Sequence, residues 1–247
     1  LEWTGGNALE ETVRATVAAD GYIEIVSATM PMGQGIATTY VQLAVDAFGV
    51  PVEKIRIVQG DTDRAEGFGS AGSRSLFTGG SAIEAAAHKV IDQAKEIAAD
   101  ALEVGQQDLD YAEGRFQVVG TDRGIGLFEV AARSDAGRIQ LDSTTKVAAP
   151  SWPNGCHICE VEIDPDTMEV SLISYSSMND VGRVVNPMIV RGQLDGGAVQ
   201  GIGQALTEAM VYDESGQPLS ASFLDYAMPR ADLIGDRKST RLNSSHG

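Results

Sequence analysis

Along the first part of the chain, apolar and polar residues alternate in short runs and recur every three to four residues in longer ones. Alternation with a period of two is typical of a half-buried strand, and a period near 3.6 is typical of a helix packed on one side. Gly49 and Gly105 follow the two longer helical patterns and are expected to end them. The predicted order is strand 11–19, strand 22–28, helix 37–48, strand 54–58, helix 81–104, a hairpin within 111–119, helix 127–132 and strand 139–147.

A second block with a similar pattern follows Pro150 and Pro153. Its predicted elements are strands 156–163 and 168–177, a long helix after residue 186, and a last hairpin from 208–212 and 220–224. Asn186-Pro187 is a good helix start, because an N-cap residue precedes proline at the first helical position. Glycine weakens a helix by up to ~1 kcal/mol relative to alanine, so we expect another backbone to pack closely on this one. The glycines concerned are Gly192, Gly196, Gly197, Gly201 and Gly203.

Both blocks have the order hairpin, loop, helix. This order predicts an α+β fold of two hairpin-loop-helix α/β modules, with mixed sheets packed on helices. We assign residues 1–150 to the first half and residues 151–234 to the second half of one domain, because two facing modules can clamp an extended ligand. Residues 235–247 are polar and basic in an otherwise acidic chain and resemble translated sequencing-adapter read-through. We expect them to be a non-native, disordered tail.

The overall charge limits the partners that the protein can have. The formal net charge is −17, and such an acidic surface repels nucleic acid and anionic membranes. No apolar run is long enough to span a bilayer, and no secretory signal pattern opens the chain. Nothing in the cysteine usage requires an oxidising compartment, so we expect a cytoplasmic protein. Because the sequence begins at Leu1 and not with Met, we also expect it to be a fragment.

The two cysteines, Cys156 and Cys159, have the spacing of a redox or metal pair. The surrounding residues alternate like a strand, in which side chains three positions apart point to opposite faces. We therefore interpret both as strand cysteines and assign no metal ligands. His88 lies at the edge of the long helical stripe without a second ligand at chelating spacing, so a packed or solvated histidine is favoured.

The most informative stretch is Gly60–Gly80, which lies between a predicted strand and the long helix. It is rich in Gly, Ser and Thr and contains Arg74. Glycines allow backbone N–H groups to approach a ligand, and a helix N-terminus adds unpaired N–H groups and a positive dipole end. A guanidinium adds a forked donor suited to phosphate. The stretch therefore predicts a cradle for a phosphate-bearing group, with a mobile surface loop as the alternative. Rossmann, P-loop and GxSxG patterns are absent from the sequence.

Several strings occur together in the order of one known family. They are MGQG (32–35), YVQLAVDAFGVPVEKIRIVQGDT (40–62), GSAGSRS (69–75), PNGCHICEVEIDP (153–165), NPMIVRGQLDGG (186–197) and SFLDYAMPRAD (222–232). Together they resemble the large, molybdenum-cofactor-binding subunit of the xanthine dehydrogenase/aldehyde oxidase family, most closely its bacterial carbon monoxide dehydrogenase branch. The likeness covers nearly all of residues 1–234.

The resemblance implies a molybdenum hydroxylase that oxidises a small substrate with oxygen from water. The implied cofactor is molybdenum bound to molybdopterin cytosine dinucleotide. The implied partners are an iron–sulfur small subunit with [2Fe-2S] clusters and a medium subunit with FAD, in a hetero-oligomer. Aldehydes, N-heterocycles and carbon monoxide all remain open as substrates, and so does the presence of copper. Two alternatives are a phosphate- or nucleotide-binding module without redox chemistry and an assembly subunit of the same fold.

The resemblance assigns site residues only where the motifs match. We expect cofactor contacts from Gly33, Gln34, Gly35, Ala71, Gly72, Ser73, Arg74, Ser75 and Gln193. Asp180 and Asn186 flank the last motif and are weaker candidates. No catalytic residue is assigned, because the family's catalytic glutamate lies in a GVGE-type string that this sequence lacks. We therefore expect the 247-residue chain to be inactive by itself.

Overall fold

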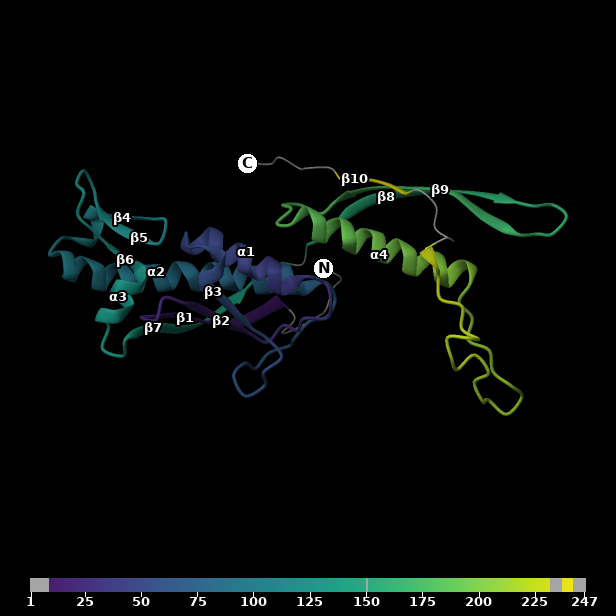
Figure 1. The fold of residues 1–247 in the computed structure, drawn as a ribbon, viewed down its shortest axis with the longest axis horizontal. Coiled ribbons are helices and arrows are strands. Elements are labelled where there is room, and N and C mark those ends of the chain that lie inside the picture. The colour runs from purple at the N-terminus through teal and green to yellow at the C-terminus, as the bar shows by residue number, and fades with distance from the viewer. Residues whose placement is uncertain (1–8, 150, 232–236, 242–247) are drawn as a thin grey trace. The chain divides into compact units, whose positions relative to one another are not determined.

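A four-stranded sheet with the order β3-β2-β1-β7 forms the centre of the first unit (Figure 1). The computed structural model describes residues 9–149, 151–231 and 237–241, and the chain divides into two units, Leu1–Trp152 and Pro153–Gly247. β1 (Glu10–Ala18) pairs antiparallel with β2 (Ile23–Ser27) and with β7 (Arg138–Lys146), and β3 (Ile55–Val58) runs parallel to β2. The strands predicted from alternation in this unit are confirmed.

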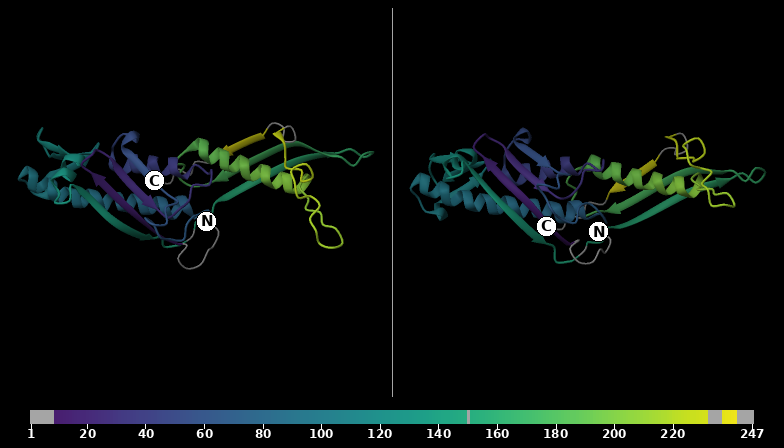
Figure 2. Two further views of the ribbon diagram at one scale, coloured as in Figure 1. Left: turned by 60° about the horizontal axis from the view of Figure 1, so that its bottom comes forward. Right: turned by 90° about the horizontal axis from the view of Figure 1, so that it is seen from below.

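Two helices cover one face of this sheet (Figure 1 and Figure 2). α1 (Ile36–Phe48) connects β2 to β3, and α2 (Ser81–Leu102) packs on β1, β7 and α1. The helices and the inward side chains of the strands form one apolar core, because alternate strand residues face the same side. The core includes Val13, Ala15, Val17, Ile25, Tyr40, Ala44, Phe48, Ile83, Val90 and Ala94. As expected, Gly49 ends α1 in the left-handed conformation.

A smaller sheet of β4 (Leu109–Ala112), β5 (Arg115–Val118) and β6 (Gly124–Gly126) leads into α3 (Leu127–Arg133). The predicted hairpin and short helix are thus confirmed. One boundary differs from the prediction, because α2 ends at Glu103 in the left-handed conformation, with φ of 55°, and not at Gly105. Two short 3₁₀ turns, η2 (Val52–Lys54) and η4 (Gln106–Asp108), precede β3 and β4.

The second unit contains a long hairpin and a long helix. β8 (Asn154–Ile163) pairs antiparallel with β9 (Val170–Asp180), and α4 (Pro187–Leu206) follows. The predicted N-cap is confirmed, because the Asn186 side chain accepts a hydrogen bond from the backbone N–H of Ile189 at 3.0 Å. Within the described residues, no helix is long and apolar enough to cross a membrane.

Three expectations for the second unit are corrected. The last hairpin is reduced to one isolated bridge between Tyr212 and Pro218, because residues 207–230 are mostly exposed and no further strand pairs with them. The expected close backbone packing on the α4 glycines is not found among the described residues. A Cβ added at Gly203 would first meet side-chain atoms of Glu208 and Pro229, at 2.6 and 2.7 Å, and the other four glycines would meet no atom within 4 Å. In the tail, β10 (Arg237–Arg241) pairs parallel with β9 and departs from the expected disorder. The rest of the tail lies outside the described residues, and its foreign origin stays a prediction.

Candidate functional site

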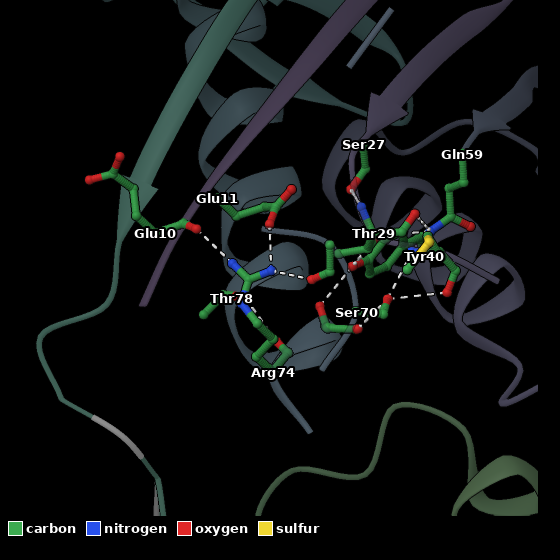
Figure 3. Close-up of polar contacts among 12 residues, drawn as sticks. Glu10, Glu11, Ser27, Thr29, Tyr40, Gln59, Ser70, Arg74 and Thr78 are labelled. Atoms are coloured by element: carbon green, nitrogen blue, oxygen red, sulfur yellow. Dashed lines mark hydrogen bonds and ion pairs between the residues drawn. The ribbon is translucent and has the colours of Figure 1, made fainter. Parts of the chain in front are cut away.

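Two loops that are distant in the sequence are joined by hydrogen bonds in the first unit, and Figure 3 shows the polar contacts around them. They are the loop from Met30 to Gly35, after β2, and the loop from Gly69 to Ser75, before α2. The Ser70 hydroxyl accepts a hydrogen bond from Met30 N at 2.8 Å and donates to Met30 O at 3.1 Å. Ser75 Oγ in turn donates to Ser70 Oγ at 2.8 Å. Ser70 therefore fastens the first loop to the second through a backbone segment.

A buried tyrosine, Tyr40, forms hydrogen bonds beside both loops. The Tyr40 hydroxyl on α1 donates to Ser75 O at 2.7 Å and accepts from Thr29 Oγ1 at 3.1 Å. The Gln59 amide donates to both oxygens of Thr29, at 2.8 and 3.0 Å. Tyr40 is fully buried, and this burial raises the pKa of its hydroxyl to about 12. The hydroxyl is thus a neutral donor that fixes the end of the second loop.

The backbone of the second loop makes a turn through two consecutive residues with positive φ. Gly72 and Ser73 have φ values of 54° and 57°, and Arg74 returns to the right-handed helical region. The N–H groups of a turn can bind an anion, and in this turn the Arg74 N–H is already used in a hydrogen bond to Ala71 O at 3.2 Å. Among the described residues, no hydrogen bond is formed by the N–H groups of Gly72 and Ser73. Ser73 is not a glycine, so its positive φ is a strained feature of the kind found at functional sites.

The helix that follows this loop begins earlier than the sequence predicts. A six-residue π-helical segment, η3 (Ser75–Gly80), runs directly into α2. The N-terminal end of the helix therefore lies at Ser75, beside the Gly72–Ser73 turn, and not at Ser81. A π-helical turn is often found at functional sites, and here it brings the helix dipole next to the loop.

Arg74 does not point out of the loop as a phosphate donor would. Its side chain is fully buried and forms an ion pair with Glu11, with a distance of 2.8 Å between Nη1 and Oε2. It also donates to the backbone oxygens of Gly69 and Glu10, each at 2.6 Å. The buried Glu11 carboxylate holds the guanidinium inside the protein, and the expected contact of Arg74 with phosphate stays a prediction. Of the remaining predicted loop residues, Ala71 and Ser73 are exposed, and Gly72 and Ser75 are half-buried.

The MGQG loop is shaped by its own glutamine. Gln34 Oε1 accepts from Met32 N at 2.6 Å, and Gln34 Nε2 donates to Met30 O at 2.9 Å. Gly33 and Gly35 have φ values of 87° and 75°, which favour glycine, and a Cβ added at Gly33 would meet no atom within 4 Å. A side-chain amide has two N–H donors and two lone pairs, so Gln34 has one of each left after these two hydrogen bonds. Its expected contact with a cofactor stays a prediction.

Gln193 lies on α4 in the second unit, where its side chain is exposed. Its expected role alongside Gln34 stays a prediction. Asn186 serves as the helix N-cap, and the Asp180 carboxylate accepts from Gly182 N at 3.0 Å. Both weaker candidates thus have local structural roles.

Cys156 and Cys159 are free, exposed residues of β8, which confirms the strand interpretation. Across the described part of the chain, no group of three or more His, Cys, Asp and Glu side chains is placed to hold a metal ion.

A cavity of about 740 Å³ in the first unit is lined by residues 62–68 and by parts of β1, β2 and β7, and its lining includes the Arg74 neighbours Glu10, Glu11 and Phe68. Its two arginines are each paired with an acid: Arg14 with Asp142, and Arg64 with Glu24. None of the predicted cofactor residues lines this cavity. The candidate site is thus the pair of loops and not the cavity.

Sequence reasoning did not identify Ser70, Thr29 and Tyr40 as parts of the site. Ser70 belongs to the GSAGSRS string and was within reach of the motif argument. Tyr40 was predicted only as a residue of the apolar helix face. Its hydroxyl contact could not be read from that pattern, because Ser75 is 35 positions away.

Most of the chain is similar in sequence to a known family of domains. Residues 2–235 match the family model of the molybdopterin cofactor-binding domain. The 6-hydroxypseudooxynicotine dehydrogenase complex subunit gamma of Paenarthrobacter nicotinovorans is 36% identical over 236 residues, which cover 92% of this chain and 30% of that protein. The carbon monoxide dehydrogenase large chain of Hydrogenophaga pseudoflava is 36% identical over 212 residues, or 82% of this chain and 26% of that protein.

The fold comparison agrees with the sequence comparison. The crystal structure of quinoline 2-oxidoreductase from Pseudomonas putida 86 matches 98% of this chain with a TM-score of 0.86 and 30% identity. The match covers 33% of that protein's chain. The predicted mixed α+β fold is confirmed by this likeness. This chain spans a third or less of the length of the relatives that it matches.

Proposed function

Because the chain belongs to the family of molybdopterin cofactor-binding domains, we propose that it is the cofactor-binding part of the large subunit of a molybdenum hydroxylase. The Met30–Gly35 and Gly69–Ser75 loops hold the phosphate and pterin portions of the cofactor, and Gln193 adds a contact from the second unit. When bound, the molybdenum centre supplies the oxidation of a small substrate with oxygen from water.

The observation that carries the proposal is the turn at Gly72–Ser73. The N–H groups of Gly72 and Ser73 form no hydrogen bond among the described residues and lie just before a helix N-terminus, and both features favour an anion. The loops offer N–H groups, hydroxyls and one amide, and their only basic side chain, Arg74, is turned into the protein. Such a neutral donor set fits a phosphate ester attached to a heterocycle rich in hydrogen-bonding groups. The residues present therefore fit the proposed cofactor.

Each residue then has a defined task. The N–H groups of Gly72 and Ser73 bind phosphate oxygens, Gly33 leaves space for close approach, and Gln34 holds the first loop while presenting its remaining amide hydrogen. Ser70 keeps the two loops in register. We propose molybdopterin cytosine dinucleotide as the cofactor form, and iron–sulfur and FAD subunits as the electron-accepting partners.

The relatives suggest substrate classes without selecting one. Their names refer to carbon monoxide, quinoline and 6-hydroxypseudooxynicotine. We propose that the full-length subunit acts on an N-heterocycle, an aldehyde or carbon monoxide. We further propose that the 247-residue chain is inactive alone, since its sequence contains no GVGE-type string. Cofactor-dependent dye reduction by the purified chain would contradict this last proposal.

The test uses the full-length large subunit, expressed with its partner subunits in a host that makes the cofactor. Molybdenum and released cytidine monophosphate are measured per protein for the natural sequence, Gly33→Ala and Gln193→Ala. Gly120→Ala is the matched control, because Gly120 also has a positive φ, 76°, and open space around an added Cβ, but lies far from the loops in the β5–β6 turn.

We expect near-stoichiometric metal and nucleotide in the natural protein and the Gly120→Ala control, and a clear loss in the other two variants. A folded, assembled complex with neither metal nor nucleotide would refute the proposal. Nucleotide without molybdenum would instead support a phosphate-binding module of the same fold.

A further inference from the structure

A buried ion pair connects the second loop to the central sheet. Arg74 at the end of the loop and Glu11 in β1 are 63 residues apart in the sequence, and neither side chain is exposed. The guanidinium donates hydrogen bonds to Glu11 Oε2, to Gly69 O at the start of the same loop, and to Glu10 O in β1. The ring of Phe68 lies over its face, 5.4 Å from Cζ. Figure 3 shows the hydrogen bonds converging on one guanidinium.

These bonds hold both ends of the loop. Because Arg74 bonds to Gly69 O, the segment between them is closed into a ring that contains the Gly72–Ser73 turn. The bonds to Glu11 and Glu10 fix that ring to β1, which pairs with β7 at these two residues and also with β2 from Val13 onward. The direction of the turn's N–H groups is thus set by a strand of the core.

The Glu11–Arg74 ion pair is not well suited to a role in stability alone. Burial raises the pKa of the Glu11 carboxyl, and the hydrogen bond and charge of Arg74, with weaker hydrogen bonds from the Ala28 backbone and the Ser27 side chain, oppose that rise. The second carboxylate oxygen, Oε1, forms no hydrogen bond of good geometry among the described residues, with Ala28 N–H and Ser27 Oγ as its weaker neighbours. Buried ion pairs can often be replaced by apolar side chains without loss of stability. A purely structural role would therefore be served as well by two apolar residues.

We propose that Glu11 and Arg74 are positioning residues, which tether the Gly69–Ser75 loop to β1 in its ligand-binding shape. This inference rests on the proposed function of the loop. Arg74 acts through the backbone that it holds and does not itself contact the phosphate. If its side chain turned outward, the Glu11 carboxylate would stay buried without the Arg74 charge, which is unfavourable. The ligand class that benefits is a phosphate ester bound by neutral N–H groups.

The test compares two double variants of the full-length complex. Glu11→Leu/Arg74→Met removes the tether and keeps an apolar filling. Arg14→Met/Asp142→Leu is the matched control, because it removes an ion pair between β1 and β7 that is exposed, with side-chain exposures of 37% and 53%. Glu11→Gln, which removes the Glu11 charge beside Arg74, is a third variant. We would measure the melting temperature and the cofactor content of each variant. We would also measure amide hydrogen exchange in peptides that span residues 67–76, using protein made without the cofactor.

We expect the tether variant to melt close to the natural protein, while exchange in residues 67–76 rises selectively. Its cofactor content at limiting supply should fall about tenfold, the factor for a loss of about 1.4 kcal/mol in a binding equilibrium. Glu11→Gln should also raise exchange in this segment, and it should lower the melting temperature because the Glu11 charge no longer offsets the burial of the guanidinium. The control should change neither exchange nor cofactor content. Unchanged exchange with full cofactor content, or exchange raised evenly along the chain, would overturn the inference.

The exchange measurement separates this inference from the proposed function. If the natural complex carries no cofactor, the proposed function fails. Loop exchange in the cofactor-free protein still decides whether the tether positions the loop.

Discussion

Gly79 is the residue whose size most directly controls the shape of the second loop. It lies in η3, and a Cβ added there would be 2.0 Å from the Tyr40 hydroxyl oxygen and 2.9 Å from Cζ. Tyr40 is fully buried, so its ring has no solvent-filled space to enter. We predict that Gly79→Ala expels the Tyr40 hydroxyl from its place under the loop.

The expected cost follows from the hydrogen bonds that the displaced hydroxyl would no longer make. These are its bonds to Ser75 O and Thr29 Oγ1, each contributing about 1 kcal/mol. Forcing a methyl group into a packed core adds about 1–3 kcal/mol. Alanine regains about 1 kcal/mol over glycine in a helix. The free energy of unfolding should therefore fall by roughly 3 kcal/mol, which lowers the melting temperature by about 10 °C in a chain of this size.

Thermal unfolding followed by circular dichroism measures this effect, with Gly80→Ala as the control. Gly80 is the next residue of the same helical segment, but its added Cβ would meet only the ends of two leucine side chains, at 3.0 and 3.3 Å. Leucine ends can turn away, so this variant should stay within about 1 kcal/mol of the natural protein. A Gly79→Ala variant as stable as Gly80→Ala would refute the reasoning from the Tyr40 contact.

Three further outcomes are expected. Burial raises the pKa of Tyr40 from 10.0 to about 12, so the unfolded chain loses this proton first, and stability should fall by about 2.7 kcal/mol as pH rises from the unfolded to the folded pKa. Urea unfolding across that range should show a shallower fall in Tyr40→Phe. Gly49→Ala should lower the melting temperature more than Gly137→Ala, because both have positive φ but only Gly49 brings its added Cβ to 2.9 Å from neighbouring backbone; equal effects would contradict this. Asn186→Ala should destabilise α4 by about 1 kcal/mol through loss of its N-cap, seen as faster amide exchange in its first turn.

The sequence alone determined the elements whose stability is local. Alternation in residues 11–19 and 22–28 predicted β1 and β2, helical spacing predicted α1 and α2, and Asn186-Pro187 marked the start of α4. These signals work because side-chain period and capping chemistry depend on residues close in the chain. The family motifs likewise located the two glycine-rich loops.

Only the tertiary structure decided how those loops are held. The sequence predicted Arg74 as a donor to phosphate, but a carboxylate from β1, 63 residues away, draws it into the core. Ser70 meets Met30 across 40 residues, and Tyr40 meets Ser75 across 35. The last hairpin was mispredicted for the same reason, because a strand forms only where another segment pairs with it. Burial and charge pairing are properties of the assembled chain, so no local pattern could fix which way Arg74 points.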